Sequence, residues 1–378
     1  MSTTSAKRRP LGRSARVRLF WASGALAALV IIVAMVPALA AATRGHQHHN
    51  VYVQKNLISD LNGVARITDP NLVNPWGLAA GPSTPLWIAD NGTDVSTLYS
   101  GGVHESIPKI LPLVVAIPGG APSGLVFNAT SDFVIHSGAV SAPAKFIFDS
   151  EVGVIAAWSP LVPPSTSAQA KFTSPDSAVF KGLAIASTSG GSFLYATDFH
   201  NGVIDVFDKN FNKVTLSGTF TDSKIPAGFA PFGIQLLNGR LYVTYAKQDA
   251  DKHDDVAGPG NGFVDVYGTS GHLLHRLISH GDLNSPWGLA IPPNGFGVFS
   301  HDLLVGNFGD GAIHVYDPNT GALRGQLMNR DGNPILIDSL WGLRFGNGVI
   351  GTRRTLLFTA GIGGEGHGLF GEIVAADH

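Results

Sequence analysis

The sequence predicts an all-β fold built from six similar units, and three observations support this prediction. A short apolar run with a central glycine occurs six times, and successive glycines are 47, 58, 51, 55 and 54 residues apart. Each run is followed by stretches in which β-branched and aromatic residues alternate with period two, separated by turn signals such as Asn-Gly. Glycine and proline are abundant, with 47 and 23 residues respectively, as many tight turns require. A repeat of about 50 residues with this content is typical of one propeller blade. The six glycines are Gly77, Gly124, Gly182, Gly233, Gly288 and Gly342.

The third repeat shows most clearly how one unit is built. After its glycine motif, residues 193–198 and 203–208 form two alternating runs around a four-residue turn, and residues 213–216 form a further run. The fifth repeat follows the same scheme. Four antiparallel strands per repeat are expected in each blade of a β-propeller. No segment after residue 42 has a sustained helical period, so we expect almost no helix.

The two ends of the chain predict how the ring closes. The last repeat has strands at 356–359 and 369–374 and then stops, one strand short of a complete blade. Residues 55–59 resemble residues 275–279, which form the outer strand before another glycine motif. An N-terminal strand that completes the sixth blade removes two exposed sheet edges. We therefore predict one domain over 51–378, a six-bladed β-propeller with four-stranded antiparallel blades.

The N-terminal segment has the pattern of an export signal. A basic stretch that ends at Arg18 precedes a mostly apolar run over 19–36, and residues 38–40 form a small-x-small cleavage site. We predict a cleaved signal peptide over 1–42, with an uncleaved membrane anchor as the alternative. Residues 43–50 are then a flexible linker that contains histidines. The mature protein is expected to be secreted or periplasmic, free of the membrane and monomeric.

Composition excludes several classes of function. The formal net charge is −2 and only 14% of the residues are charged, which argues against nucleic-acid binding, because phosphate neutralisation needs a basic surface. The chain has no cysteine, so disulfides, thiolate metal sites and cysteine nucleophiles are absent. Neither a Gly-x-Ser-x-Gly elbow nor a His-Glu-x-x-His motif occurs.

A first ring of candidate residues lies where each innermost strand begins. In a propeller these starts share one face with the turns between second and third strands, and loops on a rigid scaffold often bind ligands. We select Trp76, Trp287 and Trp341 as ligand-binding candidates that stack a ring-shaped ligand. Packing of large aromatic rings between blades is the alternative. The ring comprises Trp76, Ser123, Phe180, Phe232, Trp287 and Trp341.

A second ring is predicted where each second strand ends. Its carboxylates, amides and histidines would hold Ca²⁺ or another divalent ion if they converge, whereas turn capping is the alternative. Asp198 and Asn307 are metal-ligand candidates, Asn91 and His136 are ligand-binding candidates, and His200 is a catalytic candidate. The ring comprises Asp90, Asn91, His136, Asp198, His200, Asn307 and Asp310.

The fourth repeat contains an acidic insertion between its second and third strands, over residues 246–261. Four aspartates and one histidine occur within seven residues, in a chain with few charges elsewhere. Such a cluster is either a hydrated loop or an ion or ligand site. The metal candidates here are Asp249, Asp251, Asp254 and Asp255, with His253 as a catalytic candidate and Asn261 as a ligand-binding candidate.

A glycine-rich stretch at 361–366 is expected to form a long turn between the last two strands. It lacks a following helix and is therefore no phosphate loop. Glu365 and His367 in this turn are further candidates for the loop face.

Two motifs resemble known propeller proteins. The pattern over 195–208 resembles the NHL-type repeat of six-bladed propellers. The stretch 245–266, with Gln248-Asp249, His253-Asp254-Asp255 and Gly260-Asn261-Gly262, is similar to a family of secreted bacterial propellers of unknown function. The resemblance covers nearly all of the mature chain and implies the fold, but no catalytic residues. Some members of this family end in a C-terminal sorting anchor. Residues 373–378 do not resemble such an anchor, so the resemblance implies a protein that is released rather than anchored.

Two functional hypotheses follow. The first is a secreted propeller that binds a small molecule, a carbohydrate or a protein on its loop face. The alternative is a divalent-metal-dependent hydrolase or lyase, similar to a lactonase, that uses residues 249–255 with His253 or His200 as proton carrier. Whether the protein is an enzyme stays open, and the only cofactor suggested is Ca²⁺ or another divalent cation.

Overall fold

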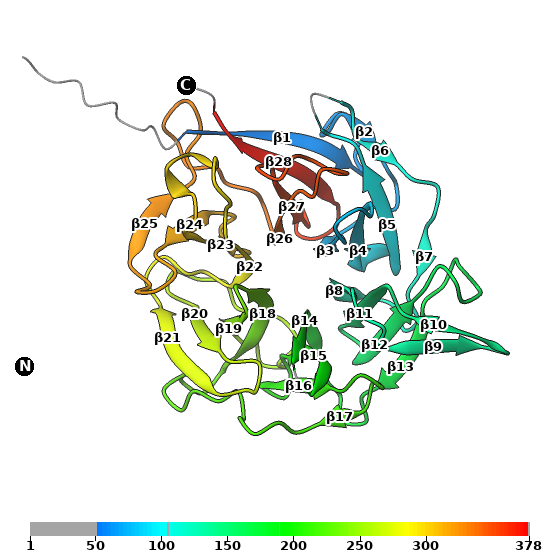
Figure 1. Ribbon diagram of the computed structural model, residues 1–378. Coiled ribbons are helices and arrows are strands. Elements are labelled where there is room, and N and C mark those ends of the chain that lie inside the picture. The colour runs from blue at the N-terminus through cyan, green and yellow to red at the C-terminus, as the bar shows by residue number, and fades with distance from the viewer. Residues whose placement is uncertain (1–50, 104–105, 189, 377–378) are drawn as a thin grey trace, which may run out of the picture. The chain divides into compact units, whose positions relative to one another are not determined.

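The computed structural model describes residues 51–103, 106–188 and 190–376, which form six antiparallel blades around a central axis (Figure 1). The predicted fold class is confirmed. The predicted signal peptide and linker, residues 1–50, lie outside the described residues. Within the described ranges, helix is limited to two short 3-10 turns, η1 (Asn91–Thr93) and η2 (Gly297–Phe299), and no helix there is long and apolar enough to cross a membrane.

The strands of each blade follow one another from the axis outward. Blade 1 contains β3 (Pro75–Ala79), β4 (Leu86–Asp90), β5 (Val95–Ser100) and β6 (Lys109–Ile110), with β7 (Val115–Ala116) also paired to β5. Blade 2 contains β8 (Pro122–Phe127), β11 (Phe146–Ser150), β12 (Val154–Trp158) and β13 (Gln169–Thr173). Blade 3 contains β14 (Phe180–Thr188), β15 (Gly191–Asp198), β16 (Val203–Phe207) and β17 (Lys213–Val214).

The second half of the ring repeats this order. Blade 4 contains β18 (Phe229–Leu237), β19 (Arg240–Lys247), β20 (Phe263–Tyr267) and β21 (Leu273–Ser279). Blade 5 contains β22 (Pro286–Ala290), β23 (Leu303–Asn307), β24 (Ile313–Tyr316) and β25 (Leu323–Gln326). Blade 6 contains β26 (Leu340–Phe345), β27 (Leu356–Ala360), β28 (Leu369–Ala375) and β1 (Tyr52–Ser59), and β1 also pairs with β2 (Ile67–Thr68).

The N-terminal strand closes the ring as predicted. Strand β1 runs antiparallel to β28, with Tyr52 opposite Ala375 and Ser59 opposite Leu369. In Figure 1 the blue β1 lies beside the red β28, so the two ends of the propeller share one blade. This pairing leaves blade 6 with the same four strands as the others and covers the edge of β28.

Blade 2 corrects the predicted position of His136. This residue lies on a separate hairpin, β9 (Val134–Ser137) and β10 (Val140–Pro143), which projects from the blade in Figure 1. The second strand of the blade is instead β11, which is buried at all its positions and is followed by Glu151. The sequence of the hairpin alternates as that of a blade strand does. However, β9 is buried at only one position, whereas β11 is buried throughout, and this difference identifies β11 as the second strand of the blade.

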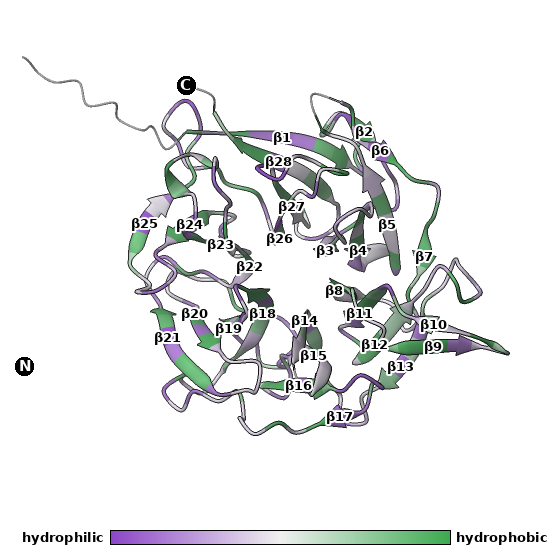
Figure 2. Ribbon diagram, in the orientation of Figure 1, coloured by the Kyte–Doolittle hydropathy of each residue, from purple (hydrophilic) through white to green (hydrophobic). Residues whose placement is uncertain are grey.

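The hydrophobic core of the described residues consists of seven clusters: six lie between neighbouring blades, and the seventh lies at the axis. The cluster between blades 6 and 1, for example, joins Ile58, Leu357 and Phe370 to Leu86 and Tyr99. Figure 2 shows hydrophobic residues in the strands of every blade, whereas the outermost strands β1, β17 and β21 carry hydrophilic stretches. Blades therefore stabilise one another through their faces, and solvent meets the outer strands.

The six repeat glycines allow neighbouring innermost strands to approach each other closely. A Cβ atom built on any of them would lie 3.0 Å or less from a backbone atom of the next blade around the ring, including Gly342, which faces Trp76. Hydroxyls from second strands bind the backbone at the same level. Thr244 Oγ1 accepts from Gly233 N at 2.8 Å, and Thr197 Oγ1 donates to Phe232 O at 2.7 Å.

Gly233→Ala is expected to destabilise the fold by about 1–3 kcal/mol, because the new methyl group would collide with the Trp287 carbonyl oxygen. Gly268→Ala in the same blade is the control, since its Cβ would meet nothing closer than Ser270 Oγ at 3.8 Å. Chemical denaturation followed by tryptophan fluorescence measures both. Equal stability of the two variants would contradict the close-approach explanation.

Candidate functional site

The residue before each repeat glycine lies at the start of an innermost strand, and five of these six side chains contact one another over the axis. Trp76 and Trp341 stack with ring centroids 3.6 Å apart, and Trp287 meets Trp76 edge-on at 6.2 Å. Phe232 lies 5.8 Å from Trp341. These aromatic rings come from blades 1, 4, 5 and 6, so they contact one another across the channel. The full set is Trp76, Ser123, Lys181, Phe232, Trp287 and Trp341.

In the third repeat, the ring position is occupied by Lys181 and not by the predicted Phe180. Phe180 was expected there, but it lies in the core cluster between blades 2 and 3. Lys181 stands immediately before Gly182 and therefore occupies the ring position. Period-two alternation explains the difference, because neighbouring residues of a strand point to opposite sides.

The tryptophans form a packed plug. Trp76 and Trp341 are only 2% and 1% exposed, and Trp287 is half-buried. Two of the three indoles also donate hydrogen bonds: Trp341 Nε1 to Asn74 Oδ1 at 3.1 Å and Trp287 Nε1 to Lys181 O at 3.0 Å. The rings thus form a rigid floor beneath the loop face and hold the backbone of Lys181 in place.

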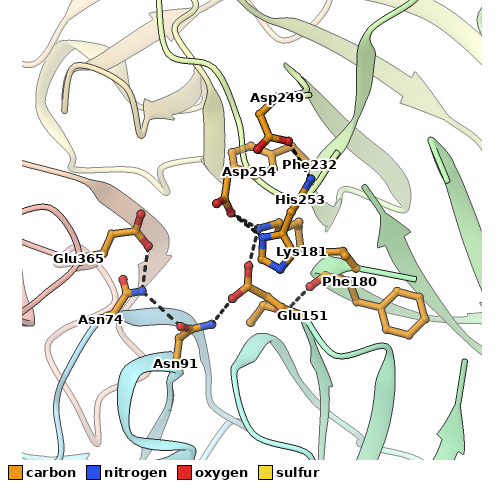
Figure 3. A network of polar contacts seen from close by, with 12 residues as sticks. Asn74, Asn91, Glu151, Phe180, Lys181, Phe232, Asp249, His253, Asp254 and Glu365 are labelled. Atoms are coloured by element: carbon orange, nitrogen blue, oxygen red, sulfur yellow. Dashed lines mark hydrogen bonds and ion pairs between the residues drawn. The ribbon is translucent and has the colours of Figure 1, made fainter. Parts of the chain in front are cut away.

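Lys181 carries a buried ammonium group beside this floor, and Figure 3 shows it next to Glu151 and Asp254. Its side chain is 2% exposed, and Nζ forms ion pairs with Glu151 Oε1 and, at 3.4 Å, with Asp254 Oδ1. Nζ also lies 5.1 Å from the ring centroid of Trp76 and 5.9 Å from that of Phe199. The two carboxylates and the two aromatic faces together offset the cost of burying the charge.

The acidic insertion folds back over the axis, which brings Asp254 to Lys181. Gln248 and Asp255 form an antiparallel bridge, so the residues between them make a tight hairpin end. Asp249 Oδ1 accepts from His253 N at 2.9 Å and fixes this turn. His253 Nδ1 lies 2.8 Å from Asp254 Oδ1. His253 and Asp254 are 48% and 69% exposed, so the site opens to solvent on this side.

A continuous polar network extends from Lys181 to the opposite side of the axis (Figure 3). Asn91 Nδ2 donates to Glu151 Oε2 at 2.8 Å, and Asn74 Nδ2 lies 3.3 Å from Asn91 Oδ1. Asn74 Nδ2 also donates to Glu365 Oε2 at 2.8 Å. With Lys181 and Asp254, the network draws on blades 1, 2, 3, 4 and 6. We call these residues, together with His253, the central polar site.

The central polar site carries more carboxyl groups than cations. Burial alone would raise the pKa of Asp254, but the hydrogen bond with His253 and the charge of Lys181 outweigh it and lower that pKa. Burial raises the pKa of Glu365, and Asn74 offsets only part of this effect. Three carboxyl groups thus face one ammonium group. Glu151, His253 and Asp254 each also offer a ligand atom, and these atoms lie within 4.8 Å of one another.

The other predicted metal ligands lie outside this network. Asp198 is buried and accepts from the backbone of Val179 and Asn201 at 3.3 and 3.0 Å, which is the role of a turn residue. Asn307 Nδ2 donates to Asp282 O at 2.8 Å. Asp251 is exposed and Asp255 is half-buried in the insertion. Of the predicted metal ligands, only Asp254 therefore reaches the central polar site, and Asp249 stabilises the turn that carries it.

Three further candidates are also placed apart from Lys181. His200 is half-buried, and its carbonyl accepts from Gln248 Nε2 at 3.4 Å. Asn261 Nδ2 donates to Val256 O at 2.9 Å within the insertion. His367 Nδ1 lies 2.7 Å from Asp60 Oδ2, next to β1.

Glu151, Lys181 and Asn74 belong to the site but were absent from the predicted candidates. Lys181 could have been found by aligning the residue before each repeat glycine, where it replaces an aromatic ring. Glu151 follows the alternating run 146–150 and precedes Gly153, which is a hairpin signal. Asn74 carries no such signal, since its role depends on Trp341, 267 residues away.

The fold and site define a six-bladed β-propeller with a polar centre over its axis, and sequence comparison places the chain in a family. No protein-family model matches it. Uncharacterized protein R648 of Acanthamoeba polyphaga mimivirus is 34% identical over 294 residues, which are 76% of this chain and 72% of the relative. Uncharacterized protein L690 of the same virus is 33% identical, with 76% and 77% covered. The chain belongs to the family of these mimivirus proteins. The bacterial family expected above is not supported by these viral relatives.

Solved structures with the same fold include two enzymes. The soluble aldose sugar dehydrogenase of Escherichia coli has a TM-score of 0.52 and 11% identity, covering 86% of this chain and all 100% of that chain. Virginiamycin B lyase of Staphylococcus aureus has a TM-score of 0.50 and 14% identity, covering 86% and 99%. At these identities the likeness shows the fold alone.

Lys181→Met is expected to raise the pKa of Asp254, because the ammonium that stabilises the carboxylate is removed. A depressed carboxyl pKa stabilises the folded state above the unfolded pKa, and this stability is lost as pH falls through the folded value. In the variant that loss therefore begins at a higher pH. Carboxyl NMR titration measures the pKa, and Lys252→Met in the same insertion is the control. An unchanged Asp254 titration would show that the ion pair is absent in solution.

Proposed function

We propose that the protein is exported and binds a small polar ligand at the central polar site on its loop face. One observation carries this proposal: Lys181 places a buried ammonium where four other blades place an aromatic ring. The scaffold accepts tryptophan or phenylalanine at this position, so the fold does not require a charge there. Buried ion pairs are weak contributors to stability compared with well-packed apolar groups. Function rather than folding then explains the lysine and the carboxylates that meet it.

The charge of the site indicates the class of ligand. Glu151 and Asp254 share Lys181, and Glu365 adds a further carboxyl group at the rim. A ligand that offers hydroxyl or cationic groups can donate to these oxygens, whereas an anionic ligand would be repelled. The aromatic floor supplies an apolar surface beneath. We therefore propose a hydroxylated or cationic small molecule, with carbohydrates as the first class to examine.

A matched pair of variants tests ligand binding. Glu151→Gln keeps the shape of the side chain but removes the acceptor charge, so the affinity for a bound ligand is expected to fall at least about tenfold. Asp251→Asn is the control, because Asp251 lies in the same insertion but is exposed and outside the network. Thermal shift with a library of sugars, polyols and amines identifies ligands, and calorimetry measures affinity.

Two outcomes would contradict the proposal. One is that no compound of either class raises the unfolding temperature of the wild-type protein. The other is that ligands bind equally well to the wild type, Glu151→Gln and Asp251→Asn, which would locate binding elsewhere.

A second candidate function is a divalent-metal-dependent hydrolase or lyase. The close grouping of ligand atoms from Glu151, His253 and Asp254 favours it. A divalent ion there would polarise a substrate carbonyl or activate water, and His253, held by Asp254, would carry the proton. Lys181 Nζ already contacts both carboxylates, so an ion must displace it. Because a metal ion would compete with Lys181 for these carboxylates, we prefer ligand binding to metal-dependent catalysis as the proposed function.

Metal content separates the two functions. If the enzyme hypothesis holds, mature protein purified without chelator or affinity histidines should contain about one equivalent of a divalent metal that depends on Asp254, measured by elemental mass spectrometry. Asp254→Ala should lose it, whereas Asp251→Asn should retain it. Protein that is metal-free before and after dialysis against Ca²⁺, Mn²⁺ and Zn²⁺ would exclude this candidate and leave the binding function.

A further inference from the structure

A second group of buried carboxylates lies in blade 1, next to blade 6, in which the N-terminal strand closes the ring. Asp90, the last residue of β4, is 0% exposed, and neither of its carboxylate oxygens has a hydrogen-bond partner. Thr97 on β5 is 1% exposed, and its hydroxyl is also without a partner. Buried polar atoms without partners are rare, so three of them on adjacent strands need an explanation.

The register of the strands places these groups together. Asp90 pairs with Val95, and Ile88 pairs with Thr97, so Asp90 and Thr97 lie on one face of the sheet. Tyr99 lies on the same face, where its ring joins the cluster between blades 6 and 1. The hydroxyl of Tyr99 donates to Asp69 Oδ2 at 2.9 Å. Asp69 follows β2 and is 2% exposed, so it links the N-terminal segment to this group.

The charge of this group is unbalanced. Burial raises the pKa of Asp90 well above its ordinary value, the nearby Thr97 offsets part of this effect, and the neighbouring Asp69 raises the pKa further. Over residues 51–103, 106–188 and 190–376, no lysine, arginine or histidine forms an ion pair with either carboxylate. Two buried carboxylates without a cation are costly. The central polar site avoids this cost through Lys181, but the blade 1 group has no equivalent.

We propose that Asp69, Asp90 and Thr97 bind one hard divalent cation, Ca²⁺ by preference, at the seam between blades 6 and 1. The donors are all oxygens, with no nitrogen or sulfur among them, which is the ligand set that Ca²⁺ and Mg²⁺ select. Two carboxylates balance the two charges of the ion. The unpartnered oxygens of Asp90 and Thr97 become ligands, and Asp69 keeps its bond to Tyr99. The ion thereby ties the N-terminal segment to the first blade and stabilises ring closure, independently of any ligand on the loop face.

Calcium titration of the untagged full chain tests this site. After chelator treatment and its removal, CaCl₂ at about one hundred times the dissociation constant is expected to raise the unfolding temperature by about 2–5 °C. Asp90→Asn should abolish the shift, while its calcium-free stability stays equal to or above that of the wild type, because an unpaired buried charge is removed. Asp254→Asn, at the central polar site, should leave the shift intact. The same titration with MgCl₂ is expected to raise the unfolding temperature by less than CaCl₂ does.

The outcomes are distinct. No shift with either salt in the wild type would overturn the proposal and identify Asp90 as a buried neutral acid. A calcium shift that is lost in Asp254→Asn but kept in Asp90→Asn would also overturn it, since the ion would then bind at the central polar site. If Asp90→Asn does not fold, Thr97→Val replaces it. This variant removes one ligand oxygen and is expected to weaken calcium affinity at least tenfold, and an unchanged affinity would count against the site.

Discussion

The close approach of six innermost strands around the axis is the constraint on which the rest of the structure depends. At that level no side chain fits between one blade and the next, so each repeat needs a glycine. The backbone groups brought together there still require partners, and the second strands supply hydroxyls for them. Thr359 Oγ1, for example, donates to Trp76 O at 2.5 Å and accepts from Gly342 N at 2.9 Å. Closure by β1 and the six interblade clusters follow from keeping these strands in a ring.

This constraint also determines where function can arise. The residue before each glycine must project over the axis, and in four blades it is an aromatic ring that helps to plug the channel. The site results from two departures from the repeat. Lysine replaces the aromatic residue in blade 3, and an acidic insertion replaces the tight turn in blade 4. Neither departure makes a site alone, because Lys181 needs carboxylates to be buried and Asp254 needs a cation to hold the insertion inward.

Buried charge in this protein is found in two arrangements. At the central polar site, carboxylates from different blades surround an ammonium that the chain itself provides. At the seam between blades 6 and 1, Asp69 and Asp90 are buried without a cation from the chain. The same physical rule, that a buried charge needs a partner, explains the first and leads to the cation proposed for the second.

Much of the fold was predictable, because glycine spacing, strand alternation and turn residues are local signals that recur in every repeat. They defined six blades, four strands per blade, the closing strand and the turn that holds Glu365. Blade 2 was the exception. The hairpin that carries His136 alternates like a blade strand, so His136 was predicted at the end of the second strand, whereas Glu151 follows that strand in the structure. The acidic insertion was recognised, but Asp254 could not be separated from Asp251 and Asp255, since only its distance to Lys181 distinguishes it.

By itself the sequence determined the architecture, the loop face and the residue types available there. Only the tertiary structure decided that Lys181, Glu151, His253 and Asp254 lie together, and that Asp90 and Asp69 are buried as neighbours. The reason is physical: repeats are specified by neighbours within about 50 residues of chain, whereas a buried charge is balanced by whatever side chain the closed ring brings to it. Lys181 and Asp254 are 73 residues apart, and Asn74 and Glu365 are 291 residues apart. Contacts of this range appear only once the six blades are in place.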